Sequence, residues 1–130
     1  IQGGELEYNG RRFIGDYVIS PKNAVKLNRW LEWAERFKSE IRDQVLVRDA
    51  HELSKLYEIE NIVHCATWSA MASLERKESR WGEAHRRTDF PERDDANWLR
   101  HVVVSQGEGL EDIRVNTRPV IGLDGKAVWS

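Results

Sequence analysis

The sequence predicts a mainly α-helical fold: an antiparallel helical bundle of two long helices and a short one, similar in kind to a spectrin repeat, with an N-terminal hairpin arm and a small C-terminal β ribbon. Two stretches, about 21–42 and 49–79, carry apolar residues at three- and four-residue spacing. Neither has an internal glycine or proline after Pro21. From about residue 101, β-branched runs alternate with glycine-containing turns. We therefore expect an arm at 1–20 and one helical domain at 21–130.

Length and composition narrow the function classes. With 130 residues, the chain is expected to form one domain and to bury a modest core. Its formal net charge of −2 indicates no general attraction to nucleic acid, and no apolar run is long enough for a transmembrane segment. Cys65 is the single cysteine, which favours a reducing, cytoplasmic location. Because the chain starts at Ile1 without a signal peptide, we expect a piece of a longer protein.

The first twenty residues are predicted to form a β hairpin. Apolar and acidic residues alternate over 5–8, as they do in a strand with one buried face. Asn9-Gly10 is typical of a two-residue type I′ turn, and 11–14 can form the returning strand. The alternative for this arm is a binding loop.

The first long helix is predicted over Pro21–Arg42. Ser20 is a suitable N-cap and Pro21 is suited to the first helical position. Trp30 and Trp33 widen an apolar stripe that we expect to face the core. The stripe consists of Leu27, Leu31, Ala34, Phe37 and Ile41.

The second long helix is predicted to start after Asp49 and to run to about Ser79. Asp49 with Glu52 three residues later resembles a capping box. Gly82 is expected to end the helix in the left-handed conformation. The expected inner face consists of Leu53, Leu56, Ile59, Val63, Ala66, Ala70 and Leu74.

Charged residues are unusually dense between these helices and the tail, over 74–101. On the end of a helix, alternate residues such as Arg76, Glu78 and Arg80 would point in different directions, each toward a separate partner. His85, Arg87 and Asp89 also alternate, and an extended segment would place all three on one face.

The second half of this stretch is expected to be extended and then briefly helical. Pro91 keeps Phe90 extended, and Asp94 or Asp95 can cap a short helix that carries Trp98. The whole stretch reads either as a salt-bridged surface loop or as a partly desolvated network between domains or beside an active site. Composition alone favours neither.

The tail is predicted to be an antiparallel ribbon. His101–Ser105 and Ile113–Thr117 have strand character, and a glycine-rich loop at 106–110 joins them. Asp124-Gly125 indicates a further turn in 120–129.

Motifs for common cofactors are absent from the sequence. The histidines are scattered, His64 and Cys65 are adjacent and diverge on a helix, and no CxxC or HExxH occurs, so no metal site is expected. No glycine-rich phosphate loop follows a predicted strand. The chain itself is therefore expected to bind no cofactor.

The order of motifs between 49 and 105 resembles the C-terminal helical domain of the succinate dehydrogenase and fumarate reductase flavoprotein family, which includes adenylylsulfate reductase alpha subunits and L-aspartate oxidases. The match runs through ERKESR, then Gly, His, Arg and Asp, then P-x-RDD-x-x-W-L-x-H. The preceding Leu56-Tyr57 and Ser69-Ala70-Met71 fit as well. Trp81 intervenes between Ser-Arg and Gly82, a form that resembles the adenylylsulfate reductase branch. The matching residues are Arg76, Glu78, Ser79, Arg80, Gly82, His85, Arg87, Asp89, Pro91, Arg93, Asp94, Asp95, Trp98 and His101.

This resemblance implies a role without chemistry of its own. In that family, FAD-binding and capping domains precede this one and supply the flavin and substrate sites, so no catalytic residue is carried over. FAD is expected in the full-length parent, and an iron–sulfur subunit is the expected partner. The resemblance implies a cytoplasmic location, at the inner face of a membrane where partner subunits hold the complex there. The residues implied to brace the preceding domains, here called the charged seam, are Arg76, Glu78, Arg80, His85, Arg87, Asp89, Arg93, Asp94, Asp95 and Trp98.

Two other functions remain open at this point. A stand-alone helical module could bind a partner protein through its tryptophan-rich surfaces and the charged seam. A small enzyme could use His85 as acid or base with Asp89 or Glu83, although no nucleophile or cofactor loop accompanies the pair.

Overall fold

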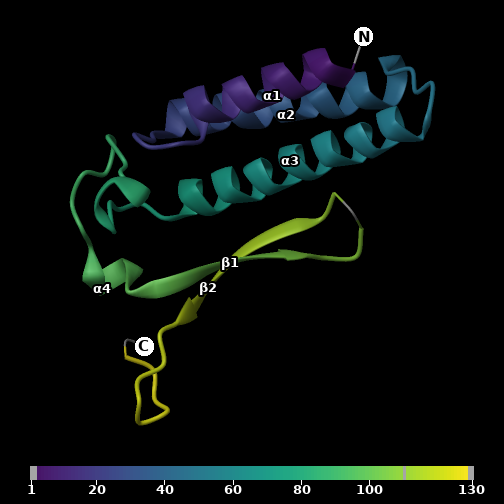
Figure 1. Cartoon of the computed structure of the whole chain (residues 1–130). Coiled ribbons are helices and arrows are strands. Elements are labelled where there is room, and N and C mark those ends of the chain that lie inside the picture. The colour runs from purple at the N-terminus through teal and green to yellow at the C-terminus, as the bar shows by residue number, and fades with distance from the viewer. Residues whose placement is uncertain (1–2, 110, 129–130) are drawn as a thin grey trace. The chain divides into compact units, whose positions relative to one another are not determined.

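The computed structural model describes residues 3–109 and 111–128 (Figure 1). It divides into two compact units: unit 1 contains the described residues up to 19 and 24–70, and unit 2 contains 20–23 and those from 71 onward. The predicted fold class, mainly helical with a small antiparallel ribbon, is confirmed. The elements are α1 (Gly3–Tyr17), α2 (Ala24–Gln44), α3 (Ala50–Glu75), the 3₁₀ helix η1 (Gly82–Ala84), α4 (Asp95–Trp98), β1 (Arg100–Gln106) and β2 (Ile113–Pro119).

Unit 1 is built from α1, α2 and most of α3, and the chain runs along the three in alternating directions (Figure 1). The predicted stripe of α2 is largely buried, and Trp30 has no exposed surface. Leu53, at the start of the predicted inner face of α3, is exposed. The apolar core consists of Leu6, Val18, Leu27, Trp30, Ala34, Phe37, Ile41, Ile59, Val63, Ala66 and Ala70.

The predicted N-terminal hairpin is wrong, because residues 3–17 form helix α1. Leu6, Gly10 and Phe13 recur at helical spacing, and the ring of Phe13 stacks on Trp33 of α2 with centroids 4.5 Å apart. This packing is a contact between distant parts of the chain, so it does not show in the local pattern. It outweighs the turn preference of Asn9-Gly10, since tertiary contacts routinely override local propensity.

The start of the first long helix also differs from the prediction. Helix α2 begins at Ala24, so Ser20 is not its N-cap and Pro21 is not its first residue. Residues 20–23 instead belong to unit 2, where Lys22 pairs in parallel with a distant segment. The N–H of Lys22 donates to the carbonyl of Arg86 at 2.7 Å, and the N–H of Thr88 donates to the carbonyl of Lys22 at 2.8 Å.

The predicted cap of the second long helix is confirmed. The N–H of Glu52 donates to Asp49 Oδ1 at 2.8 Å, and Glu52 in turn accepts from the N–H of Arg48 at 2.8 Å. The end of the helix was placed too late, because α3 stops at Glu75. Gly82 is left-handed as expected, with φ 59°, but it lies beyond the helix and follows Trp81, which is also left-handed.

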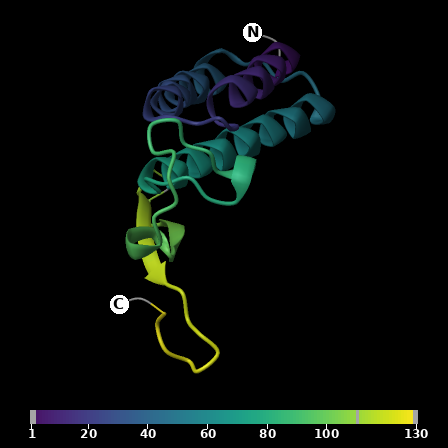
Figure 2. The same ribbon diagram turned by 90° about the vertical axis from the view of Figure 1, so that its left-hand side faces the viewer.

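The C-terminal part of unit 2 is the predicted ribbon. β1 and β2 are antiparallel, with Arg100 opposite Pro119 and Gln106 opposite Ile113. The ribbon leads into a tail that folds back on itself, as Figure 2 shows. In that tail the N–H of Gly122 donates to the carbonyl of Lys126 at 2.8 Å, and Gly125 has φ 75°, which confirms the predicted turn.

Substitution of Gly10 by alanine tests the helical conformation of α1. An added Cβ at Gly10 meets no atom within 4 Å, and glycine inside a helix costs entropy. Gly10→Ala should therefore raise the free energy of unfolding by about 0.5–1 kcal/mol, as measured by urea unfolding. In a hairpin turn the same change would be destabilising. Gly82→Ala is the matched control: φ is +59° there, so it should lower stability by about 1 kcal/mol.

Candidate functional site

Helix α3 ends at the start of the charged stretch, and residues 76–80 that follow are outside the helix. Arg76, Glu78 and Arg80 therefore lie on one side of the chain and pair with one another, where the sequence predicted separate directions. This correction follows from the early helix end, because the divergence of residues two apart was expected only for a helical backbone. Each of the three also reaches a partner of its own, as the sequence predicted. Arg76 donates to the carbonyls of Trp98 and Arg100, Glu78 accepts from the N–H of Asp94, and Arg80 pairs with Asp95.

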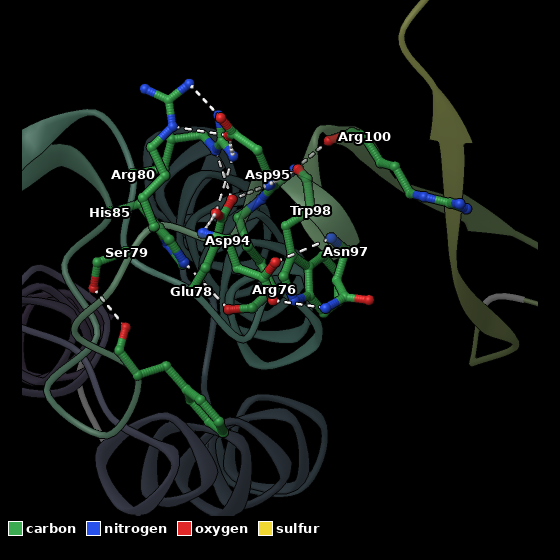
Figure 3. A network of polar contacts seen from close by, with 12 residues as sticks. Arg76, Glu78, Ser79, Arg80, His85, Asp94, Asp95, Asn97, Trp98 and Arg100 are labelled. Atoms are coloured by element: carbon green, nitrogen blue, oxygen red, sulfur yellow. Dashed lines mark hydrogen bonds and ion pairs between the residues drawn. The ribbon is translucent and has the colours of Figure 1, made fainter. Parts of the chain in front are cut away.

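The carboxylate of Glu78 is the centre of this network (Figure 3). It has no exposed surface. Its Oε1 accepts from Arg76 Nη1 at 2.6 Å and from Arg80 Nε at 2.6 Å. Its Oε2 accepts from Arg80 Nη2 at 3.0 Å and from the N–H of Asp94 at 2.9 Å. Burial alone would raise the pKa of Glu78, but hydrogen bonds from Arg80, the Asp94 backbone and Arg76 outweigh it and lower the pKa.

The network continues into α4 through Asp95. Arg80 Nη2 lies 2.5 Å from Asp95 Oδ1, and Arg93 chelates the same carboxylate at 2.8 and 3.0 Å. Arg93 first and Arg80 second hold the pKa of Asp95 below its ordinary value. Asp94 caps α4 by accepting from the N–H of Asn97 at 3.1 Å, which confirms one of the two predicted caps.

Arg76 ties the network to the start of the ribbon. Besides Glu78, its guanidinium donates to the carbonyl of Trp98 at 2.8 Å and to the carbonyl of Arg100. Its Cζ also lies 5.3 Å and 5.8 Å from the ring centroids of Trp81 and Trp98, within cation–π range. The side chain is 6% exposed, so the helix end, α4 and β1 are joined around one buried cation.

Arg87 donates hydrogen bonds to the free backbone carbonyls at the C-terminal end of α3. Its guanidinium chelates Asp89 at 2.8 and 2.7 Å. Nη1 donates to the carbonyl of Ser73 at 2.6 Å and to that of Arg76 at 3.2 Å. The last carbonyls of a helix have no partner within it, and a cation at that end also offsets the helix dipole. Arg87 is 1% exposed and is therefore a buried C-terminal cap of α3.

His85 and Ser79 complete the site. His85 Nε2 lies 3.3 Å from the carbonyl of Arg76. Burial lowers the pKa of His85, and the nearby cations Lys22, Arg76 and Arg87 lower it further, although the hydrogen bond to Arg76 opposes this. Ser79, which the sequence prediction did not place in the site, accepts from the N–H of Arg87 at 2.8 Å, and its hydroxyl lies 2.8 Å from the carbonyl of Phe90.

The charged seam predicted from sequence is thus brought together in unit 2. His85, Arg87 and Asp89 converge as the alternation predicted, because Asp89 pairs with Arg87 and both His85 and Arg87 reach the carbonyl of Arg76. The contacts described above lie within unit 2 itself. The role of the seam between domains stays a prediction.

The geometry gives little support to acid–base catalysis by His85 with Asp89 or Glu83. The carboxylate of Asp89 chelates Arg87, and that of Glu83 pairs with Arg86 at 3.1 Å, so both are committed to arginines. Among residues 3–109 and 111–128, no three His, Cys, Asp or Glu side chains are grouped as metal ligands. Within the same residues, no helix combines the length and hydropathy of a membrane span.

Replacement of Arg87 by methionine should unfold unit 2 more easily. The change leaves the carbonyls at the end of α3 without the Arg87 donor and removes the ion pair between Arg87 and Asp89. We therefore expect a loss of about 3 kcal/mol in the free energy of unfolding. The neighbouring Arg86→Met is the control: its side chain is 57% exposed and its loss should change stability by less than about 0.5 kcal/mol. Equal effects in urea unfolding would refute the capping role.

The stability of unit 2 should also fall on mild acidification. Because the pKa of His85 is below 6.5 in the fold, the unfolded chain binds more protons as pH falls through that value. The stabilisation is complete above about pH 6.5 and is lost progressively as the pH falls below that value toward the lowered pKa of His85 in the fold. His85→Gln keeps a donor toward Arg76 without titrating. Its unfolding free energy should be flatter across this range, and an unchanged slope would exclude His85 as the cause.

Comparisons with known proteins agree with this architecture. The sequence model described as "Fumarate reductase flavoprotein C-term" matches residues 13–123. The chain is 39% identical over 62 residues to the succinate dehydrogenase flavoprotein subunit of Coxiella burnetii, covering 48% of this chain and 10% of that protein. It is 41% identical over 69 residues to the fumarate reductase flavoprotein subunit of Mycobacterium tuberculosis, covering 53% and 11%.

The fold is also found in a solved structure. Adenylylsulfate reductase from the hyperthermophilic Archaeoglobus fulgidus superposes with a TM-score of 0.86 at 24% identity, covering 100% of this chain and 20% of that chain. The segments matched in the curated relatives make up only about a tenth of those proteins' length. With the family match extending over 13–123, the chain belongs to the family of C-terminal domains of fumarate reductase and succinate dehydrogenase flavoproteins.

Proposed function

We propose that this domain braces the FAD-binding and capping domains of a FAD-dependent oxidoreductase and does not catalyse a reaction alone. The observation that carries the proposal is the family match over 13–123, together with a matched segment that makes up only 10% of a curated relative. A domain of this kind must hold its shape so that the surfaces it presents to the rest of the protein stay fixed. Its charged residues are suited to that task.

The buried network supports a structural role in particular. Glu78 receives four hydrogen bonds, and Arg76 and Arg87 each join segments distant in sequence. Fully satisfied polar networks rigidify the backbone around them. An acid–base site would instead need a titratable group free to exchange a proton with a substrate. The carboxylates beside His85 in sequence, Glu83 and Asp89, are occupied by arginines.

The cofactor, partner subunit and substrate proposed here are those of the full-length flavoprotein. FAD would bind in the preceding domains, and an iron–sulfur subunit would receive or supply the electrons on the cytoplasmic side of a membrane. The curated relatives are named for succinate dehydrogenase and fumarate reductase, which supports a small dicarboxylate as substrate. Adenylylsulfate is the alternative, supported by Trp81 after Ser79-Arg80 and by the shared fold.

A stand-alone interaction module is the second candidate function. Helix α3 carries exposed aromatic side chains, with Tyr57 57% and Trp68 40% exposed. Exposed aromatics of this size often mark protein contacts. The reading frame upstream of Ile1 separates the candidates: several hundred residues with a glycine-rich loop after a strand support the flavoprotein, and a start codon at the beginning of this chain supports the module.

The purified chain should be colourless. Without the preceding domains it should show no flavin absorbance and no succinate-dependent dye reduction, even after incubation with FAD. The longer product of the same reading frame, purified in parallel, should carry flavin. Flavin that co-purifies in stoichiometric amount with residues 1–130 would contradict the proposal that the cofactor site lies elsewhere.

A further inference from the structure

A cationic pocket lies in unit 2 beside the ion-pair network. Its volume is about 450 Å³, and its walls include Lys22, Ser73, Arg76, Trp81 and His85. No aspartate or glutamate is among the described residues that line it. Arg76 is already neutralised by Glu78 outside the pocket wall, and the lowered pKa of His85 leaves its ring uncharged at neutral pH. Among the described residues that line the pocket, Lys22 and Arg100 are the cations without a carboxylate partner, and Lys22 is the one held half-buried.

Lys22 is incompletely satisfied in this position. Its half-buried ammonium donates to Ser73 Oγ at 3.1 Å, and among the described residues no carboxylate forms an ion pair with it. An ammonium group has three donors, and a charge withdrawn from water is costly unless it is paired. Burial lowers the pKa of Lys22, and the charge of Arg87 lowers it further. A carboxylate placed in the pocket would supply the missing counter-charge.

Trp81 at the wall of the pocket is held in an unusual conformation. Its φ of 60° is left-handed, which is costly for a bulky residue, and the indole is 66% exposed. Two hydrogen bonds fix the turn: the N–H of Arg80 donates to the carbonyl of His85 at 2.9 Å, and the N–H of Ala84 donates to that of Trp81 at 3.2 Å. The turn thus displays a large apolar ring next to a cationic pocket, a combination suited to polypeptide with an acidic side chain.

We propose that the pocket binds the carboxylate of an aspartate or glutamate that the preceding polypeptide of the parent flavoprotein inserts beside Lys22, while Trp81 packs against the inserted segment. This inference rests on the proposed function. About nine tenths of each curated relative lies outside the matched segment, so ample polypeptide exists to supply the acidic residue. A free small anion would use Lys22 but would leave the exposed indole uncovered.

The pocket can be tested first in the 130-residue chain. Uniformly ¹⁵N-labelled protein is titrated with N-acetyl-L-aspartate N-methylamide, a blocked acidic residue, while the indole N–H signals of Trp81 and Trp98 are followed. We expect saturable shifts with a dissociation constant on the order of millimolar, and none with the asparagine counterpart. Equal shifts with both compounds, or none with the aspartate compound, would overturn the inference.

Matched lysine variants identify the cation. Lys22→Gln should weaken binding of the aspartate compound by about fivefold or more, and its backbone pairing with Arg86 and Thr88 is retained. Lys77→Gln removes an exposed charge of the same stretch that does not line the pocket, and should bind as the wild type does. Inorganic phosphate is titrated in parallel. Binding about tenfold tighter than that of the aspartate compound, and dependent on Lys22, would make this a small-anion site and overturn the assignment.

The parent protein then tests the source of the carboxylate. The preceding part of the parent is expressed separately, and its affinity for the 130-residue chain is measured by calorimetry. Lys22→Glu should weaken association about tenfold, Lys77→Glu should not, and an acidic-to-lysine change in the partner should restore it. If the parts associate but Lys22→Glu has no effect, this inference alone fails. If the reading frame holds no flavin-binding part, the proposed function fails with it, while the titration still reports on the pocket itself.

Discussion

Unit 2 depends on the buried carboxylate of Glu78. Within the described residues, every fully buried apolar side chain belongs to unit 1, whereas the buried residues of unit 2 are polar or charged, Arg76, Glu78, His85 and Arg87 among them. A buried carboxylate is costly unless several donors compensate it, and Glu78 has four hydrogen bonds from three residues. Those donors are the residue after α3, a residue of the irregular segment that follows and the N-cap of α4, so satisfying one charge fixes three segments.

A polar centre of this kind defines geometry more than it adds stability. Replacing a buried ion pair by apolar residues is often neutral or stabilising, whereas removing one partner is strongly destabilising. Removal of one partner of a buried ion pair should therefore destabilise unit 2. The hydrogen bonds from guanidinium groups to carbonyls at the end of α3 fix its backbone. Arg87 illustrates the point, because one side chain both neutralises Asp89 and caps α3. A domain that positions other domains benefits from such definition.

Much of this was predictable from sequence where the signal is local. Periodicity predicted α2 and α3, Asp49 was correctly identified as a cap, and alternation placed Arg87 and Asp89 on one face. The failures share one cause, which is contact between residues distant in sequence. Helix α1 is favoured by the stacking of Phe13 on Trp33, and α3 ends where Arg87, 14 residues beyond Ser73, reaches its carbonyls. Neither contact can be predicted from the sequence pattern of the neighbouring residues.

The residues of unit 2 fall into two groups: those whose polar groups are paired within the unit, and those left available to bind a partner. Motif resemblance assigned the seam to contacts with other domains, yet the carboxylates of Glu78, Asp89 and Asp95 are paired within the unit. A side chain whose hydrogen bonds are complete has little to gain from a partner, since exchange of one ion pair for another is nearly neutral. Binding energy must then come from groups left unsatisfied or exposed, here Lys22 and Trp81. Lys22 joins the site through contacts with Ser73 and Thr88, 51 and 66 residues away, which explains why the motif order did not include it.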